Sequence, residues 1–292
     1  MKDRLIGIAY KENEPLDKHT TFRIGGPARF FVMPKNRKEI VQVVKACKET
    51  KMKYFLLGNG SNVLFMDEGY DGVVIQIGDA MNKISLDGQT IYAEAGAMLG
   101  KVAMMAKDAS LTGMEFAAGI PGTLGGAIVM NAGAYGGEMK DIVVSVDVLD
   151  EDGTLHTYSC EEMQFGYRTS RLCGKEFVVG AAIALSQGNK EDIVGRMDEL
   201  KNARITKQPL EYPSAGSTFR RPEGYFSGKL IEDAGLRGVS IGGAMVSEKH
   251  CGFVINHNHA TAKDVLTLIA FIQRKVYDTF QVKLEPEVKI IQ

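Results

Sequence analysis

The chain is poor in the features that mark secreted, membrane-spanning and nucleic-acid-binding proteins. Its four cysteines (Cys47, Cys160, Cys173 and Cys251) lie far apart, so a disulfide framework is not expected and a reducing compartment fits better. No apolar run approaches the roughly 20 residues that span a bilayer, and the first residues lack the apolar core of a signal peptide. Basic and acidic residues number 35 and 36, which gives no electrostatic reason to expect a nucleic-acid or membrane-surface partner. We therefore expect a soluble, cytoplasmic protein.

Glycine, by contrast, is abundant. It makes up 33 of the 292 residues, about 11% against an average near 7%. The sequence contains no repeat and no low-complexity run, so the glycines must serve particular turns and close backbone approaches. A ligand with a long polyanionic stretch would use glycine in this way.

The length predicts two or three domains, and the residue pattern predicts both helices and strands. Asn36 is expected to cap a helix with Glu39 three residues later, and Thr261 to cap the last one. Further helices are expected at about 99–106 and 191–207, strands at 54–57, 72–77, 91–95, 144–148 and 177–185, an Asp-Gly hairpin turn at 150–153, and a linker at 186–190. Because helices and strands do not alternate strictly, we predict an α+β fold.

Two glycine-rich stretches are candidates for a phosphate site. Residues 57–62 follow a predicted strand, and their backbone N–H groups could form an anion-binding nest. Val63 replaces the third glycine of a dinucleotide fingerprint, and no P-loop Gly-Lys-Ser/Thr follows, so an ordinary tight turn explains this stretch equally well. Residues 118–137 are too rich in glycine for a regular element and too apolar for a solvated linker. A cofactor would satisfy their backbone groups, although a structural Ω-loop is the alternative.

Seven short motifs follow one another along nearly the whole chain. They are His19-Thr-Thr-Phe-Arg-Ile-Gly-Gly-Pro-Ala, Leu56-Leu-Gly-Asn-Gly-Ser-Asn, Gly119-Ile-Pro-Gly-Thr-Leu-Gly-Gly-Ala, Tyr167-Arg-Thr-Ser, Pro213-Ser-Ala-Gly-Ser-Thr-Phe, Gly228-Lys-Leu-Ile-Glu and Leu284-Glu-Pro-Glu-Val. Each motif is weak alone. In this order they resemble the UDP-N-acetylenolpyruvoylglucosamine reductase family, whose FAD-binding signatures are similar to the first three.

The resemblance implies an FAD-binding domain of the vanillyl-alcohol-oxidase type over residues 1–187, with subdomains of about 1–66 and 67–187. A smaller α+β substrate-binding domain would cover 188–292, with residues 282–292 returning to the active site. The lack of an insertion between Arg168 and Ser217 suggests the family's shorter class, without the loop whose tyrosine covers the substrate. Non-covalent FAD, NADPH as co-substrate and a monomeric state are also implied.

The reaction implied by the resemblance is the reduction of UDP-N-acetylglucosamine enolpyruvate to UDP-N-acetylmuramate for peptidoglycan synthesis. NADPH reduces FAD, flavin N5 delivers a hydride to C3 of the enolpyruvyl group, and a proton is added at C2. Negative charge then develops at C2 and on the adjoining carboxylate. Such a site needs cationic or hydrogen-bonding groups aimed at that charge and a proton donor on the correct face.

Three residues match the family's catalytic positions. Ser217 matches the proton donor, and Arg168 matches the arginine that holds the substrate carboxylate, for which a guanidinium is well shaped. Glu287 matches the catalytic glutamate and would need a raised pKa, which burial can provide. Glu285 lies two residues earlier on the same face of an extended segment, so its contribution stays open.

The remaining site residues are binding positions. For the cofactor they are Arg23, Gly25, Gly58, Asn59, Gly60, Ser61, Asn62, Gly119, Ile120, Pro121, Gly122, Gly125, Gly126 and Asn131. For the substrate they are Tyr167, Arg204, Lys207 and Lys229. Arg204 and Lys207 could instead be solvated basic residues at a helix end.

No metal site is expected, because the spacing of His250, Cys251, His257 and His259 matches no common zinc pattern. Two other functions remain open. One is a flavin oxidase of the same fold that acts on an alcohol, and the other is a non-catalytic protein that binds flavin or a nucleotide sugar.

Overall fold

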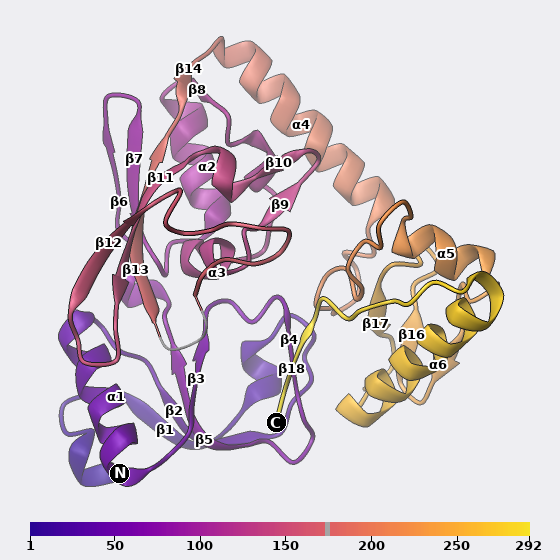
Figure 1. The fold of residues 1–292 in the computed structure, drawn as a ribbon, viewed down its shortest axis with the longest axis horizontal. Helices are drawn as coiled ribbons and strands as arrows, with labels where there is room; N and C mark the ends of the chain where they lie inside the picture. Colours follow the sequence, from indigo (N-terminus) through magenta and orange to yellow (C-terminus); the bar gives the residue numbers. More distant parts are fainter. Residues whose placement is uncertain (173–175) are drawn as a thin grey trace. The chain divides into compact units, whose positions relative to one another are not determined.

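The structure is a computed structural model that describes residues 1–172 and 176–292, so Cys173 lies outside the described residues. The α-helices are α1 Arg37–Thr50, α2 Leu99–Asp108, α3 Leu124–Val129, α4 Lys190–Lys207, α5 Ser227–Asp233 and α6 Ala262–Phe280 (Figure 1). Short 3-10 helices cover Lys2–Arg4, Leu16–His19, Asp79–Met81, Glu115–Ala117 and Met139–Asp141.

The strands are short. They are β1 Tyr10–Pro15, β2 Pro27–Val32, β3 Tyr54–Leu57, β4 Val63–Phe65, β5 Tyr70–Gln76, β6 Ile84–Asp87, β7 Thr90–Glu94, β8 Leu111–Thr112, β9 Gly133–Ala134, β10 Gly137–Glu138, β11 Val143–Leu149, β12 Leu155–Ser159, β13 Phe177–Ala184, β14 Ser186–Gln187, β15 Ser240–Ile241, β16 Ala244–Val246, β17 Val254–Asn256 and β18 Lys289–Ile291. The predicted helices and strands are confirmed in type, with ends shifted by a few residues.

The chain forms two compact units that interleave in sequence. Unit 1 comprises Met1–Glu12, Phe30–Asn59 and Gly72–Arg204, and unit 2 comprises Asn13–Arg29, Gly60–Asp71 and Ile205–Gln292. The sequence predicted a linker at residues 186–190, and part of this segment is in regular structure. Ser186 pairs with Thr112, and the Gly188 N–H donates to the Ser110 carbonyl at 2.9 Å. The last change from unit 1 to unit 2 along the chain falls between Arg204 and Ile205, inside α4.

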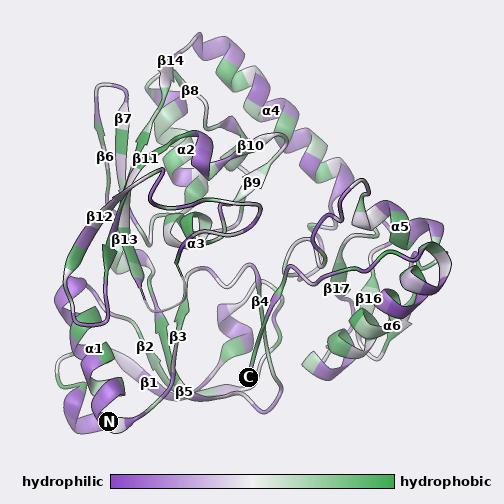
Figure 2. Ribbon diagram, viewed as in Figure 1, coloured by the Kyte–Doolittle hydropathy of each residue, from purple (hydrophilic) through white to green (hydrophobic). Residues whose placement is uncertain are grey.

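Unit 1 contains an antiparallel sheet in the order β12-β11-β13-β7-β6, with α2 and α3 packed against it (Figure 1). A second sheet includes the parallel pair β3 and β5. The amphipathic helix α1 buries Ile40, Val43 and Val44 in the unit 1 core, and its cap is the predicted one, since Asn36 Oδ1 accepts from the Glu39 N–H at 3.0 Å. Figure 2 shows hydrophilic and hydrophobic residues alternating along this helix.

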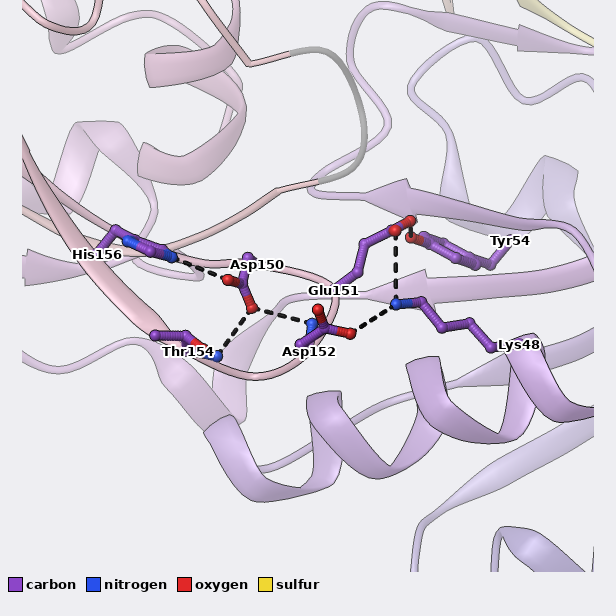
Figure 3. A network of polar contacts seen from close by, with 7 residues as sticks. All are labelled: Lys48, Tyr54, Asp150, Glu151, Asp152, Thr154 and His156. Atoms are coloured by element: carbon purple, nitrogen blue, oxygen red, sulfur yellow. Dashed lines mark hydrogen bonds and ion pairs between the residues drawn. The ribbon is translucent and has the colours of Figure 1, made fainter.

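The turn between β11 and β12 is held by one carboxylate. Asp150 accepts from the backbone N–H groups of Asp152 and Thr154, each at 2.9 Å, and lies 2.9 Å from His156 Nε2 (Figure 3). These bonds lower the pKa of Asp150 to about 2, with the His156 contact as the largest cause. The predicted Asp-Gly turn is therefore present, and hydrogen bonds to the Asp150 side chain stabilise it.

The same turn is tied to other elements of unit 1. Lys48 on α1 lies 3.0 Å from Asp152 and 3.5 Å from Glu151, and the Tyr54 hydroxyl on β3 donates to Glu151 at 2.8 Å (Figure 3). Gly153 packs so closely on α1 that an added Cβ would lie 2.7 Å from the Val41 side chain. These contacts hold the hairpin against the helix.

Unit 2 has a small antiparallel sheet, β15-β16-β17, covered by α6. Thr261 and Asp264 form a capping box at the start of α6, as the sequence predicted for Thr261. The helix buries its apolar face, comprising Val265, Leu268, Ile269, Ile272 and Val276, in a core separate from that of unit 1. Strand β18 pairs in parallel with β4, so the chain's last residues join a segment from its first quarter. Within the described residues, every helix is too short or too polar to cross a bilayer.

Candidate active site

In unit 1 the two glycine-rich stretches meet. Strand β3 ends at Leu57, and the next turn places Asn59 Nδ2 2.6 Å from the Pro121 carbonyl that it donates to. A Cβ added at Gly58 would lie 2.5 Å from Thr123 Oγ1. Gly58 therefore lies in close contact with Thr123, and the two predicted cofactor loops lie against each other and form one surface in unit 1.

Part of the second stretch finds its hydrogen-bond partners within the protein. The Gly125 N–H donates to the Ala95 carbonyl at 2.8 Å, and the Leu99 N–H donates to the Gly122 carbonyl at 2.9 Å. A Cβ on Gly125 would lie 3.0 Å from Ala95 Cβ, so this helix start packs directly on the end of β7. The short helix α3 begins here and orients the loop before it.

Arg204 adds a cation to this surface. Its side chain lies over Gly119, where an added Cβ would be 3.1 Å from both Cδ and Nη1 of the arginine. Burial lowers the pKa of Arg204, and Tyr135 counteracts that shift in part. No hydrogen bond or ion pair joins the Arg204 guanidinium to another residue that the structure describes. A half-buried cation of this kind suits an anionic ligand, so the residues fit a group that carries phosphates or a carboxylate.

Arg168 lies in a two-residue turn of unit 1. Gly166 and Thr169 exchange backbone hydrogen bonds of 3.0 and 3.3 Å, and Arg168 has φ 56, which is uncommon outside glycine. Its Nη2 donates to the Gly133 carbonyl at 2.8 Å. Tyr167 is exposed, with the Arg168 guanidinium 5.2 Å from its ring centroid. A residue held in this backbone region is a candidate for function.

In unit 2 the serine motif lies beside the C-terminal segment. The Glu287 N–H donates to the Thr218 carbonyl at 2.8 Å, and the Arg220 N–H donates to the Glu285 carbonyl at 2.9 Å. Ser217 is exposed and follows Gly216, whose φ is 77 and whose added Cβ would meet no atom within 4 Å. There is open space beside Gly216, the residue before this serine.

The first glycine-rich stretch continues into unit 2, where it contacts the C-terminal segment that contains Glu287. Asn62 Nδ2 donates to the Glu287 carbonyl at 3.2 Å, and the Lys289 N–H donates to the Asn62 carbonyl at 3.0 Å. Gly60 has φ 65, and an added Cβ would lie 2.1 Å from the His19 carbonyl oxygen. Asn62, the last residue of the Gly-Asn-Gly-Ser-Asn sequence, thus contacts the segment that contains Glu287 directly.

Lys289 is a residue that the sequence reasoning missed. Burial lowers its pKa, and the nearby cation Arg220 lowers it further. Lys289 and Arg220 are near enough to repel each other, and two neighbouring cations favour a negative ligand. The available signal was its position two residues after the predicted catalytic glutamate, on the same face of an extended segment.

The other predicted site residues are less distinctive. Lys229 forms an ion pair with Asp233 one turn later on α5, and this contact raises its pKa. Lys207 is exposed at the end of α4. Arg23 has φ 54 and is exposed, and an added Cβ on Gly25 would lie 2.9 Å from Phe65 Cβ. Ser61 and Ile120 lie in the two glycine-rich loops, and Gly126 lies in α3.

Among the residues that the structure describes, no group of three or more His, Cys, Asp or Glu is placed to hold a metal ion. His250 Nδ1 accepts from the Gly252 N–H at 3.0 Å, and the His257 ring packs against Tyr212 with centroids 5.5 Å apart. These histidines have structural contacts.

Comparison with known proteins extends this description. The sequence model of the FAD binding domain matches residues 28–159, and that of the UDP-N-acetylenolpyruvoylglucosamine reductase C-terminal domain matches residues 208–291. A UDP-N-acetylenolpyruvoylglucosamine reductase of Caldanaerobacter subterraneus is 54% identical over 96% of this chain and 92% of its own. One from Clostridioides difficile is 50% identical over 98% of this chain and 96% of its own.

A solved structure, that of UDP-N-acetylenolpyruvylglucosamine reductase from Thermus caldophilus, aligns over 98% of this chain and 99% of its own with a TM-score of 0.84 at 36% identity. The α+β fold with an FAD-binding domain is thus confirmed, and the protein is an FAD-dependent oxidoreductase. The chain belongs to the UDP-N-acetylenolpyruvoylglucosamine reductase family. It reduces the enolpyruvyl group of its UDP-N-acetylglucosamine substrate with NADPH, in peptidoglycan synthesis.

Proposed function

We propose that Ser217, Arg168 and Glu287 carry out this reduction. The observation that supports the proposal most directly is the 2.8 Å hydrogen bond from the Glu287 N–H to the Thr218 carbonyl. It links the serine motif to the glutamate motif, far apart in sequence, within one unit. FAD, when bound, supplies the hydride that is added to the double bond.

Ser217 donates the proton to C2 of the substrate. A serine hydroxyl is a weak acid, but the charge that develops on C2 makes that carbon a strong base. The preceding Gly216 has a left-handed φ of 77 and leaves open space on its own side. The serine can therefore approach a ligand closely. Glu287 acts beside it, protonated or as a hydrogen-bond partner of the developing charge.

Arg168 holds the substrate carboxylate. A guanidinium presents its donors in a planar fork, and the bond from Nη2 to the Gly133 carbonyl restrains where that fork lies. Tyr167, Arg204, Lys207 and Lys229 bind other parts of the UDP-sugar. Of these, Arg204 is best supported, because its half-buried charge has no carboxylate against it in the described chain.

The cofactor is held by the two glycine-rich loops and the Arg23–Gly25 turn. Their backbone N–H groups and small side chains suit a pyrophosphate and the edge of a ring. We assign FAD contacts to Arg23, Gly25, Gly58, Asn59, Gly60, Ser61, Asn62, Gly119, Ile120, Pro121, Gly122, Gly125 and Gly126.

In functional terms, residues 1–187 serve the cofactor and residues 188–292 serve the substrate, although the compact units interleave. We also propose that the protein works as a cytoplasmic monomer. Size-exclusion chromatography with light scattering would test the monomer, because a dimer would double the measured mass.

The catalytic proposal is tested by separating the two half-reactions anaerobically while flavin absorbance is followed. The variant Ser217→Ala should be reduced by NADPH at the normal rate. Its reoxidation by the enolpyruvyl substrate should slow about 10²–10⁴-fold, the usual contribution of a general acid. Ser214→Ala, in the same motif, is the matched control and should behave as the parent protein. Normal reoxidation of Ser217→Ala would remove this serine from the mechanism.

A further inference from the structure

Asn131 is one of few fully buried polar side chains in the described chain, with 0% of its surface exposed. It follows α3 with φ 42, its own N–H donates to the Ile128 carbonyl at 3.2 Å, and the Ala132 N–H donates to the Ala127 carbonyl at 2.8 Å. This pair of bonds is the Schellman arrangement that ends many helices. Glycine is the usual residue at such a position and asparagine is the next choice, so the backbone permits an asparagine without requiring one.

The side chain supplies the explanation. Asn131 Nδ2 donates to Glu138 Oε2 at 2.7 Å and to the Gly166 carbonyl at 3.0 Å, while Oδ1 accepts from the Lys140 N–H at 2.9 Å. A primary amide has two N–H donors, and both are used by protein groups. The side chain therefore has no donor left for a cofactor, although the sequence placed Asn131 among the cofactor-binding residues.

These bonds lead to Arg168. Gly166, which accepts from Asn131, is the first residue of the turn that contains Arg168, and the Arg168 guanidinium donates back to Gly133, two residues after Asn131. The segments 131–133 and 166–168 are thus joined by two hydrogen bonds, of 3.0 and 2.8 Å, that run in opposite directions. Together with the backbone they close a ring that fixes both the turn and the guanidinium.

Glu138 braces this ring. It pairs with Gly133 across β9 and β10, so the carboxylate that holds Asn131 lies opposite the carbonyl that holds Arg168. Its other oxygen lies 2.5 Å from Lys140 Nζ. Asn131 therefore precedes β9 in the chain and is also hydrogen-bonded to Glu138 of β10. These two strands carry the Gly133 carbonyl that accepts from Arg168.

We propose that Asn131 is a positioning residue that acts through Arg168 and holds its guanidinium in the orientation that binds the substrate carboxylate. The inference rests on the proposed role of Arg168. Misplacing a binding group by about 1 Å can slow a reaction about 10²-fold. Loss of the Asn131 side chain should therefore slow the half-reaction that uses the substrate and spare the one that does not.

The test is a double-mutant cycle on the FAD-loaded protein. Asn131→Gly keeps the left-handed backbone and removes only the side chain. It should slow anaerobic reoxidation by the enolpyruvyl substrate about tenfold to 10²-fold. Reduction by NADPH and the dissociation constant of FAD should change by no more than about twofold. In an Arg168→Ala background the same substitution should have an effect of no more than about twofold, because the group through which Asn131 acts is gone.

Each other outcome overturns the proposal in a distinguishable way. Equal slowing in both backgrounds would mean that Asn131 acts on the fold generally. Weaker FAD binding would return Asn131 to the cofactor site. Normal reoxidation of Arg168→Ala alone would show that the proposed role of Arg168, and with it this inference, is wrong. If Asn131→Gly does not fold, Asn131→Asp replaces it in the cycle, because aspartate keeps the acceptor for Lys140 but cannot donate to Gly166 when ionised.

Discussion

Glu287 and Thr218 are joined backbone to backbone, with the Glu287 N–H donating to the Thr218 carbonyl at 2.8 Å. The bond places the residue after Ser217 beside the predicted catalytic glutamate. The Arg220 N–H donates in the same way to the Glu285 carbonyl. Both acidic residues therefore lie in the segment that pairs with residues 218–220. They differ in environment, because Glu287 is half-buried and Glu285 is exposed.

This difference gives a direct test of which carboxylate acts. Glu287→Gln should slow reoxidation of the reduced flavin by the substrate about 10²-fold or more, since it removes the group that we propose acts as an acid or hydrogen-bond partner at the reacting carbon. Glu285→Gln is the matched control and should retain the parent rate. The measurement is the anaerobic single-turnover rate of each variant. A larger loss in Glu285→Gln would reverse the assignment.

Arg204 should contribute to binding of the anionic substrate. Arg204→Met keeps much of the apolar stem over Gly119 but removes the charge, and it should raise the KM for the UDP-sugar about tenfold to 10²-fold, as expected for a lost charge-assisted hydrogen bond. Steady-state kinetics would measure this, with Lys201→Met, exposed on the same helix, as the control. An unchanged KM together with weaker FAD retention would assign Arg204 to the cofactor phosphates.

The β11–β12 turn should make the stability of the fold depend on pH in the acidic range. The pKa of Asp150 is lowered to about 2 by His156 and by backbone N–H groups, whereas an aspartate in the unfolded chain titrates near 3.9. The carboxylate therefore stabilises the fold fully above about pH 4 and loses this effect as the pH falls towards about 2. Asp150→Asn should lower the urea midpoint at pH 5, and the gap to the parent protein should narrow at pH 3.

Asp87→Asn, near the exposed turn after β6, is the control for this pH series and should show no such narrowing. A gap for Asp150→Asn that stays constant from pH 5 to pH 3 would contradict the proposed source of the effect.

Two glycines should respond to alanine in opposite ways. At Gly60 a methyl group would lie 2.1 Å from the His19 carbonyl oxygen in a backbone with φ 65, so Gly60→Ala should lower the free energy of unfolding by more than about 1 kcal/mol. Gly195 lies inside α4 with no atom within 4 Å of an added Cβ. Gly195→Ala should therefore raise the free energy of unfolding by about 0.5–1 kcal/mol. Urea unfolding measures both, and equal signs would refute the distinction.

Local features followed from the residues alone. The caps at Asn36 and Thr261, the amphipathic faces of α1 and α6, and the Asp-Gly hairpin all depend on side chains a few residues apart, so their patterns are legible in one chain. The family followed from seven ordered motifs, and the comparisons support it over 96% of the chain.

Contacts between residues far apart in the sequence could not be predicted from such local patterns. The residues around Gly166 do not indicate that its carbonyl accepts a hydrogen bond from Asn131. The residues around Asn62 likewise do not indicate that its side chain donates to the Glu287 carbonyl. The interleaved units were missed for the same reason, because the chain passes between them inside regular elements, namely β1, β2, β5 and α4, as well as after Asn59. Periodicity reports which face of an element is buried, whereas the partner of that face depends on the packing of the complete chain. The sequence by itself thus determined the local elements, namely the helices, their caps and the hairpin turn. Only the tertiary structure decided which of these elements and side chains contact one another.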